Sequence, residues 1–154
     1  MRKQNILLYP PELATQFISE FEQGPKGGPA LESYKCPAGV WTIGFGHAQN
    51  VHKGDVITRS EAYELLDRDL QRTQEELATL IRIDINENQF IALMSFVYNF
   101  GLTKCRTYRL FGMINRGEWE NVRTWWPKYC NPDNPVVTEG LKDRRIRELN
   151  LFFS

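Results

Sequence analysis

The sequence predicts an α+β fold that is mainly helical, formed by a single domain over residues 1–154. Most of the chain carries apolar residues at the three- and four-residue spacing of amphipathic helices. One short stretch, residues 40–45, is instead rich in the β-branched and aromatic residues that favour a strand. A chain of 154 residues is long enough to bury one hydrophobic core, and its apolar content of 42% is typical of globular proteins.

The first predicted helix covers residues 10–23. Pro10 and Pro11 suit its start, because the missing N–H of proline costs little in the first turn of a helix. Its apolar residues recur at helical spacing, namely Leu13, Phe17, Ile18 and Phe21. Two acids near its end, Glu20 and Glu22, project about 200° apart around the helix, so only one of them can face a given site. Helical geometry alone leaves open which one does.

The next segment, residues 23–30, contains three glycines and two prolines and predicts a flexible loop. After it we expect a β-hairpin with strands at residues 31–35 and 40–45. Gly44 and Gly46, at the end of the second strand, allow the backbone to bend sharply or to approach another group closely.

The hairpin carries the polar residues that suggest chemistry, Tyr34, Cys36, Thr42 and His47. A carboxyl at the end of the preceding helix would face them. This arrangement suits an enzyme that moves protons in a cleft, and the alternative is an ordinary hairpin on a small domain. An ordinary cysteine thiol has a pKa near ~8.5, so Cys36 would be mostly protonated at neutral pH. Lys35 is expected to point to the opposite face of its strand and to give Cys36 little help.

The rest of the chain is predicted to be helical after a third short strand near residues 55–58. Thr58 and Glu61 form the capping-box pattern of a helix start. The apolar side of that helix is formed by Ala62, Leu65, Leu66, Leu70 and Leu77. A further helix is predicted at residues 86–99, with Asn86 as N-cap. Two more are predicted at 106–116 and 118–126, separated by a break at Gly117. After a loop at 131–135, the last helix is predicted at 138–152, with Thr138 as N-cap.

Three tryptophans, Trp119, Trp125 and Trp126, lie in or beside these last helices. Indole rings can stack on sugars or pack in a core, and core packing is the expected role here.

Composition excludes several classes of function. Nineteen acids balance nineteen bases, which argues against nucleic acid as the main partner and against a cationic grip on an anionic cell wall. The N-terminus has only a three-residue apolar run, so no signal peptide or membrane segment is expected. The three cysteines are expected to be reduced thiols, with a Cys105–Cys130 bridge as the alternative. Two histidines are too few for a convincing metal site, and no cofactor is implied.

Several blocks of the sequence resemble a known family. Phe21-Glu22, Tyr34 and the run Cys36-Pro-Ala-Gly-Val-Trp-Thr-Ile-Gly-Phe-Gly-His47 resemble the phage-type lysozymes, the endolysins of glycoside hydrolase family 24. Residues 92–101 and 140–148 extend the resemblance in the same order. It covers roughly residues 17–153 and implies a lysozyme-like fold with two lobes, a small hairpin lobe with the N-terminal helix and a larger helical lobe, with a cleft between them.

The resemblance also implies roles for individual residues. The catalytic positions that match the family are Glu22, Cys36 and Thr42, the last two separated by the family's six-position step. The implied substrate-binding residues are Tyr34, Asn99 and Phe100. His47 is expected to contact Asp69 and so tie the hairpin lobe to the helical lobe. Arg145, or else Lys142, is expected to pair with the catalytic glutamate. Compared with the family pattern, the loop at 23–30 is longer by about five residues. Insertions in surface loops cost little folding free energy.

The implied activity is that of a lysozyme, an N-acetylmuramidase (EC 3.2.1.17) that hydrolyses peptidoglycan during phage lysis. The resemblance implies a monomer that binds the peptidoglycan glycan strand and stays in the host cytoplasm until a holin lets it reach the periplasm and cell wall. Two rival interpretations are a peptidoglycan-binding structural or baseplate module that has lost catalysis and a secreted antibacterial effector with the same chemistry. Cys36 either acts directly as a thiolate or orients water while Glu22 does most of the work.

Overall fold

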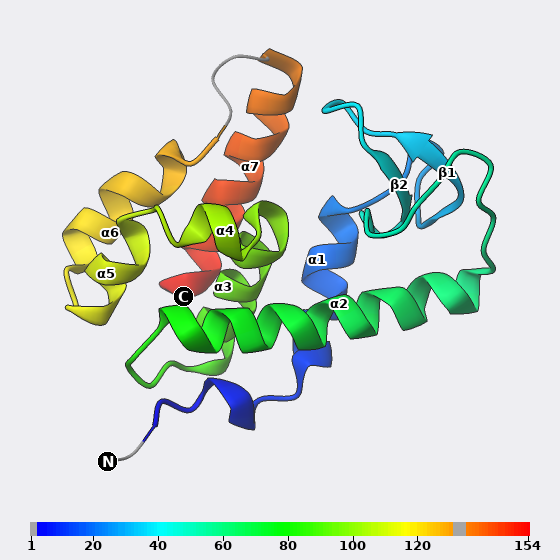
Figure 1. The fold of residues 1–154 in the computed structure, drawn as a ribbon. Helices are drawn as coiled ribbons and strands as arrows, with labels where there is room; N and C mark the ends of the chain where they lie inside the picture. Colours follow the sequence, from blue (N-terminus) through cyan, green and yellow to red (C-terminus); the bar gives the residue numbers. More distant parts are fainter. Residues whose placement is uncertain (1–2, 131–134) are drawn as a thin grey trace. The chain divides into compact units, whose positions relative to one another are not determined.

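The computed structural model describes residues 3–130 and 135–154, apart from the side chains of residues 135–138. It is mainly helical with one two-stranded antiparallel hairpin, so the predicted fold class is confirmed (Figure 1). The chain divides into two compact units. We call residues 11–71 the hairpin unit, and residues 1–10 together with 72–154 the helical unit.

The hairpin unit begins with a short 3-10 turn, η2 (Pro11–Ala14), which leads into α1 (Thr15–Phe21). The predicted single helix is therefore split, with its first turn wound more tightly. Ala14 and Ile18 are fully buried and anchor this segment in the core of the unit. α1 ends at Phe21, two residues before the predicted end, and Glu22 is its C-cap residue, which donates its backbone N–H to the carbonyl of Ile18.

The hairpin consists of β1 (Ala30–Lys35) and β2 (Trp41–Gly44). The third strand expected near residues 55–58 is wrong as a strand, because pairing there is limited to an isolated bridge between Glu32 and Val56. Backbone hydrogen bonds from Ser33 to Asp55 and from Ile57 to Leu31 hold this segment beside β1.

The long helix α2 (Arg59–Leu80) contributes its first half to the hairpin unit and its second half to the helical unit. The predicted capping box is present. The backbone N–H of Glu61 donates to the Thr58 hydroxyl, and the backbone N–H of Thr58 donates to the Glu61 carboxylate, both at 3.1 Å. Of the predicted apolar side, four residues are buried and Leu65 is half-buried: the buried ones are Ala62, Leu66, Leu70 and Leu77.

The helical unit is built around α3 (Glu87–Phe100). Asn86 is its N-cap as predicted, in a capping box with Gln89. The helix is buried over most of its surface, as its nearly continuous apolar sequence predicted. The N-terminal segment, which includes η1 (Ile6–Leu8), is fixed to this unit by the Gln74 side chain, whose amide donates to the carbonyls of Ile6 and Tyr9.

The region after α3 differs from the prediction of one helix over residues 106–116. A short helix, α4 (Leu102–Cys105), comes first, and α5 covers only Leu110–Asn115. The reason lies in the connecting turn, where the Thr107 hydroxyl donates to the carbonyl of Lys104 at 2.7 Å. A threonine hydroxyl that binds a nearby carbonyl competes with continued helical hydrogen bonding.

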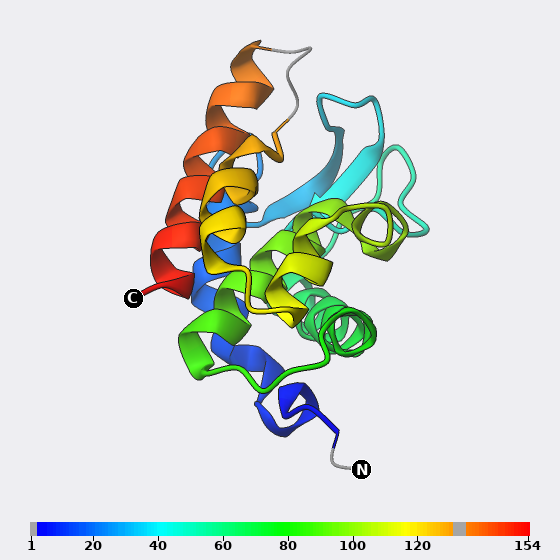
Figure 2. The same ribbon diagram turned by 90° about the vertical axis from the view of Figure 1, so that its left-hand side faces the viewer.

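The last helices close the unit, with the predicted break at Gly117 present at a φ of 67°. α6 (Trp119–Trp125) runs into the turn η3 (Trp126–Lys128), and α7 (Pro135–Phe152) packs against α3 and η3 (Figure 2). Thr138 as the N-cap of α7 is wrong, because the helix already begins at Pro135, and proline is well suited to a first helical position. The rest of the predicted loop, residues 131–134, lies outside the described residues.

The three tryptophans differ in their burial. Trp126 is completely buried, so core packing is confirmed for it. Trp119 and Trp125 are about two-fifths exposed, and Trp119 packs against Phe152 and Phe153.

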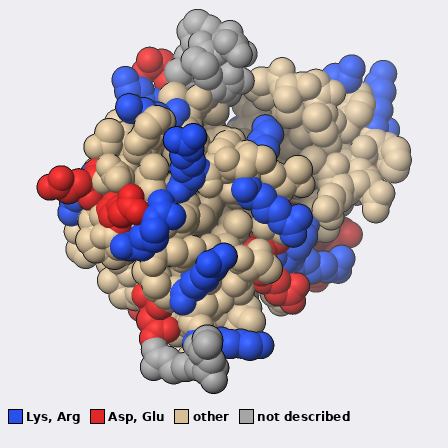
Figure 3. Space-filling view, turned by 60° about the vertical axis from the view of Figure 1, so that its left-hand side comes forward, with Lys and Arg blue, Asp and Glu red and all other residues tan. Residues whose placement is uncertain are grey.

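In the described part of the chain, no helix is both long and apolar enough to span a bilayer. Over the same residues, no group of three or more His, Cys, Asp or Glu side chains is placed to hold a metal ion. On the face shown in Figure 3, Lys and Arg side chains are spread among acidic and uncharged residues.

Candidate active site

The candidate site in the hairpin unit starts from the Glu22 carboxyl, whose position depends on Gly46. A Cβ atom built on Gly46 would lie only 2.5 Å from Glu22 Oε2 and 3.2 Å from its Cδ. The φ of Gly46 is 76°, a conformation that other residues rarely adopt. The close approach that the sequence predicted for this glycine is confirmed, and the group that it approaches is the Glu22 carboxyl. Glu20, by contrast, is exposed to solvent.

The register of the hairpin brings three of the predicted site residues together. Tyr34 pairs directly with Thr42, and Cys36 is two residues after Tyr34, so all three share one face of the hairpin. Lys35 pairs with Trp41 on the opposite face, where its Nζ lies 5.5 Å from the indole centroid. The prediction that Lys35 would point away from Cys36 is therefore confirmed.

Tyr34 lies close to both candidate catalytic groups. Burial raises the pKa of its phenol, and the negative charges of Glu22 and Cys36 raise that pKa further. The phenol therefore stays protonated at neutral pH and is available as a hydrogen-bond donor.

Cys36 lies at the base of a tight turn. Its N–H donates to the carbonyl of Val40, and its carbonyl accepts from Gly39 N–H. Burial by itself would raise the pKa of the Cys36 thiol. Hydrogen bonds from the backbone of Val40 and Ala38 and from the Thr42 side chain outweigh burial and leave the pKa below its ordinary value. The turn thus stabilises a thiolate without any cationic side chain.

Thr42 is almost fully buried, and its hydroxyl has one proton to give. In the structure Oγ1 donates that proton to the carbonyl of Val40 at 3.0 Å. The same hydroxyl is in reach of the Cys36 sulfur, so rotation of the O–H can move the hydrogen bond to the sulfur when the thiol ionises. This gives Thr42 a role that its lack of an ionisable group left unspecified in the sequence.

The expected contact between His47 and Asp69 is present, with Nδ1 2.8 Å from Oδ2. The other ring nitrogen, Nε2, lies 3.0 Å from the carbonyl oxygen of Gln49. Both nitrogens face oxygen acceptors, so both contacts are hydrogen bonds only when the ring carries two protons. His47 and Asp69 both belong to the hairpin unit. The contact therefore fixes the end of the hairpin to the first half of α2, and the role predicted for it as a tie between two lobes is wrong.

In the helical unit, Asn99 and Phe100 lie at the end of α3 and line a pocket of about 540 Å³. The other lining residues are Lys104, Tyr108, Lys128, Tyr129, Cys130 and Leu141. Asn99 Oδ1 is buried and accepts no hydrogen bond from the described residues. A buried acceptor without a partner is costly, which makes this oxygen available to a donor group of a ligand.

Arg145 is completely buried in the helical unit and forms an ion pair with Glu148. Its Nε lies 2.7 Å from Oε1, and its Nη2 donates to Oε2 at 2.9 Å. The guanidinium also lies 4.6 Å from the ring centroid of Phe100. Burial lowers the pKa of Arg145, and the charge of Glu148 opposes this effect. The pairing of Arg145 with Glu22 stays a prediction, as does the Lys142 alternative.

Glu148 is the residue that sequence reasoning missed. It is fully buried, accepts hydrogen bonds from Ser95 and Trp126, and lies within ion-pair distance of both Arg144 and Arg145. The signal was in the sequence, because arginines three and four residues before a glutamate lie on the same side of a helix.

Known relatives match most of the chain. A model of the phage lysozyme family matches residues 26–148. An endolysin of Acyrthosiphon pisum secondary endosymbiont phage 1 is 35% identical over 130 residues, which cover 82% of this chain and 89% of that protein. Two endolysins of Bacillus phages, 34% identical, are longer, and the chain spans 43% and 50% of their lengths.

Solved structures agree with these matches. The muramidase domain of SpmX from Asticaccaulis excentricus has a TM-score of 0.78 at 26% identity, covering 92% of this chain and 95% of that chain. An endolysin from Escherichia coli O157:H7 phage FAHEc1 has a TM-score of 0.77 at 26% identity, covering 92% and 91%. Sequence and fold thus lead to the same assignment, and the chain belongs to the phage lysozyme family of peptidoglycan hydrolases.

Proposed function

We propose that the chain is a single-domain N-acetylmuramidase (EC 3.2.1.17) that hydrolyses the β-1,4 bond between N-acetylmuramic acid and N-acetylglucosamine. The observation that carries the proposal is the space that Gly46 leaves for the Glu22 carboxyl, beside a hairpin face bearing Tyr34, Cys36 and Thr42. Acids and polar groups in this arrangement are what glycosidic hydrolysis requires.

In the proposed reaction, Glu22 is the general acid and gives its proton to the oxygen of the leaving sugar. The Cys36 thiolate takes a proton from the attacking water, whose oxygen forms the new bond to the anomeric carbon. Thr42 holds the thiolate by rotating its O–H toward the sulfur. The thiol proton then returns through solvent to the Glu22 carboxylate, so one water is consumed and both groups are restored.

The proposed glycan-binding residues are Tyr34 in the hairpin unit and Asn99 and Phe100 in the helical unit. Support for the last two is the pocket that they line and the buried Asn99 oxygen. This oxygen has no hydrogen-bond donor among the described residues and suits an amide or hydroxyl donor such as those of N-acetylated sugars. His47 and Asp69 are proposed to hold the hairpin in place for catalysis, and Arg145 to act on the charge of the catalytic glutamate.

We also propose that the protein is a monomer that stays in the host cytoplasm until a holin opens the way to the periplasm and cell wall. Membership of a family of phage endolysins supports this route. Lysis of intact cells that depends on a co-expressed holin would agree with it, and lysis without a holin would contradict it.

The test of the activity is mass analysis of fragments released from purified peptidoglycan. Hydrolysis leaves reducing N-acetylmuramic acid ends. Anhydro ends would show that the reaction is a transglycosylation and not a hydrolysis. Glu22→Gln should lose at least ~100-fold in rate while remaining folded, because an amide cannot donate the acid's proton. The matched control is Glu20→Gln, two residues away and exposed, which should act like the unaltered protein. Wall binding without any cleavage would favour the structural-module interpretation.

A further inference from the structure

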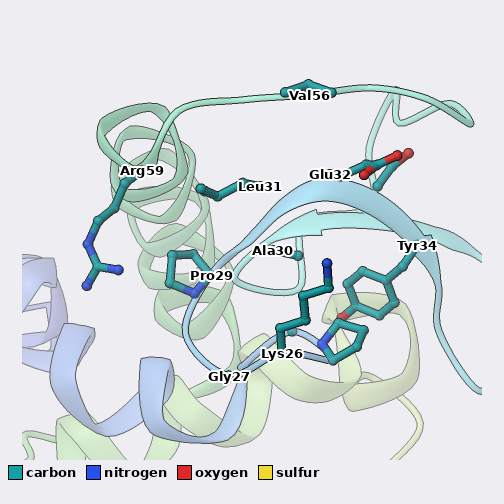
Figure 4. Close-up of a pocket in the computed structure, with 12 residues that line it drawn as sticks. Lys26, Gly27, Pro29, Ala30, Leu31, Glu32, Tyr34, Val56 and Arg59 are labelled. Carbon is teal, nitrogen blue, oxygen red and sulfur yellow. The ribbon is translucent and has the colours of Figure 1, made fainter.

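Two pockets of the protein differ in how their walls are held. In the hairpin unit, a pocket of about 630 Å³ is lined by the loop at residues 24–29, by β1 and by Arg59 (Figure 4). The loop wall is fixed through the backbone, because Gly24 N–H donates to the carbonyl of Gly28 at 2.7 Å and a Cβ on Gly24 would lie 2.8 Å from the Cβ of Ala30. The pocket of about 540 Å³ in the helical unit has three aromatic side chains in its wall, Phe100, Tyr108 and Tyr129. The shape of this second pocket depends on the groups that hold these rings from behind.

Arg145 of α7 lies directly behind the aromatic wall. Its guanidinium is 4.6 Å from the ring centroid of Phe100, and its Nη1 donates to the backbone carbonyl of Tyr129 at 3.4 Å. The Arg145 side chain has no exposed surface. A ligand in the pocket therefore contacts Phe100 and Tyr129 and not Arg145, which can act on the ligand only through these two residues.

Phe96 of α3 completes the support. Its ring centroid is 4.9 Å from the guanidinium of Arg145, so the cation contacts two successive aromatic residues on one side of α3. The Phe96 ring also meets the three aromatic rings of the wall, with centroid distances of 4.8 Å to Phe100, 6.1 Å to Tyr108 and 5.5 Å to Tyr129. The guanidinium and the Phe96 ring thus form one buried base beneath the wall of the pocket.

Glu148 fixes the orientation of the guanidinium. Nε and Nη2 of Arg145 lie 2.7 Å and 2.9 Å from the two oxygens of the Glu148 carboxylate. Two parallel contacts between planar groups set both the position and the plane of a guanidinium. A lysine ammonium would keep the charge, but it has no plane to orient and is a point donor.

Stability alone does not explain a buried arginine at this place. Taking a guanidinium out of water is costly, and well-packed apolar residues often replace buried ion pairs without loss of stability. An apolar side chain could not supply a fixed cationic plane against the Phe100 ring, an attraction that strengthens where water is excluded. The contact with the pocket wall is therefore what the arginine adds to the core.

We infer that Arg145, held by Glu148, is a positioning residue for glycan binding that keeps Phe100 and Tyr129 in the conformation that receives the sugar. The inference rests on the proposed function, in which Phe100 binds the glycan strand. This role is separate from the proposed action of Arg145 on the catalytic glutamate, and the two roles affect different constants. Loss of the positioning role raises KM, whereas a changed charge at the glutamate alters kcat and its pH dependence.

The test uses Arg145→Lys, which keeps the charge and removes the plane. With soluble glycan strands as substrate, KM should rise roughly three- to tenfold, and kcat should stay within about twofold of its original value. Arg145→Met is the second variant, because it leaves Glu148 within ion-pair distance of Arg144, and it should raise KM at least as much. The matched control is Ile114→Ala, which truncates a fully buried side chain of the same unit and should lower the melting temperature without changing KM.

A double-mutant cycle shows whether Arg145 acts through the ring of Phe100. Phe100→Leu should itself raise KM, and the addition of Arg145→Lys should raise it by less than about twofold more, because the ring that the guanidinium holds is gone. Fully additive effects, or a loss confined to kcat, would overturn the inference.

Binding is measured separately by NMR titration with tri-N-acetylchitotriose, an oligomer of N-acetylated sugars. The dissociation constant should rise in Arg145→Lys by the same factor as KM and stay unchanged in Ile114→Ala. Equal affinity of Arg145→Lys and the unaltered protein for this sugar would overturn the inference and leave the muramidase proposal standing. If the unaltered protein releases no reducing ends from peptidoglycan, the proposed function itself fails.

Discussion

At the residue scale, the Glu22 carboxyl occupies space that only a glycine at position 46 leaves open. Both properties of Gly46 matter, its φ of 76° and its missing side chain. A substitution there tests two effects at once, so the control must reproduce the backbone effect alone. Gly54 provides it, with a φ of 85° and no heavy atom within 4 Å of its Cβ position.

We predict that Gly46→Ala abolishes most of the activity, because the methyl group would displace the carboxyl. Gly54→Ala should cost about 1 kcal/mol of unfolding free energy from backbone strain and keep its activity. Urea unfolding and release of reducing ends measure the two quantities. Equal activity in both variants would show that the approach to Glu22 does not matter for catalysis.

Cys36 differs from an ordinary thiol because backbone groups and Thr42 stabilise its ionised form. Its lowered pKa means that the thiolate persists at pH values where a free cysteine is protonated. As pH falls through this lowered pKa, the thiolate is lost, and any activity that depends on it should fall as well.

Alkylation by iodoacetamide, followed against pH in a Cys130→Ser background, should therefore have its midpoint below that of a free thiol. Cys105 should stay silent in this assay, because burial and the charge of Glu76 raise its pKa to about 12. Thr42→Val removes one donor to the sulfur and should move the midpoint to higher pH. An unchanged midpoint would mean that Thr42 does not contact the thiolate.

Substitution of Cys36 separates its two possible roles. Cys36→Ser keeps a small polar atom but removes the ionisable group, and direct participation predicts a large drop in turnover, with substantial rescue in Cys36→Asp. Near-normal turnover in Cys36→Ser would leave Glu22 as the essential ionisable group of the pair.

At the element scale, the loop between α1 and β1 closes on itself through hydrogen bonds between its own glycines. Loops of this kind contribute little to global stability, because their removal exposes few buried groups. The sequence predicts a flexible loop here, and we expect this loop to be dispensable for folding.

We predict that deletion of residues 25–29 leaves the melting temperature nearly unchanged, because a surface loop of this length contributes little to global stability. Thermal unfolding followed by circular dichroism measures the first effect. A large drop in melting temperature would show that the contact between Gly24 and Ala30 is essential to the unit.

At the scale of the whole molecule, each compact unit has a core of its own, and that of the helical unit contains a buried charge cluster. Glu148 holds Arg144 and Arg145 from α7, and it also accepts hydrogen bonds from Ser95 of α3 and Trp126 of η3. One carboxylate therefore joins three elements. Its removal would take away the carboxylate that the buried guanidinium groups of Arg144 and Arg145 share.

Glu148→Gln should destabilise the protein by about 3–5 kcal/mol, the usual cost of breaking a buried ion pair from one side. Glu139→Gln, on an exposed part of the same helix, should change the unfolding free energy by less than about 0.5 kcal/mol. Urea unfolding of both variants provides the comparison. Similar stability of the two variants would show that the cluster does not stabilise the unit.

The sequence by itself determined much of this protein. Helical spacing and capping boxes placed α2 and α3, because these signals come from residues three or four positions apart. The strand pattern placed the hairpin, and alternation along a strand correctly put Lys35 away from Cys36. Recognition of the family blocks selected Glu22 over Glu20, a choice that helical geometry had left open.

Only the tertiary structure decided how distant residues meet. Gly46 makes room for Glu22, and the loop at residues 24–29 lines a pocket together with Arg59, and both arrangements depend on residues far apart in the chain. The lowered pKa of Cys36 depends on how its turn folds, which spacing along the sequence does not give. Local pattern also failed after α3, where the predicted helix over residues 106–116 is shortened to α5, which begins only at Leu110, after a turn in which the Thr107 hydroxyl donates to the carbonyl of Lys104. Spacing along the sequence reports which face a side chain lies on, whereas the packed fold decides which group it touches there.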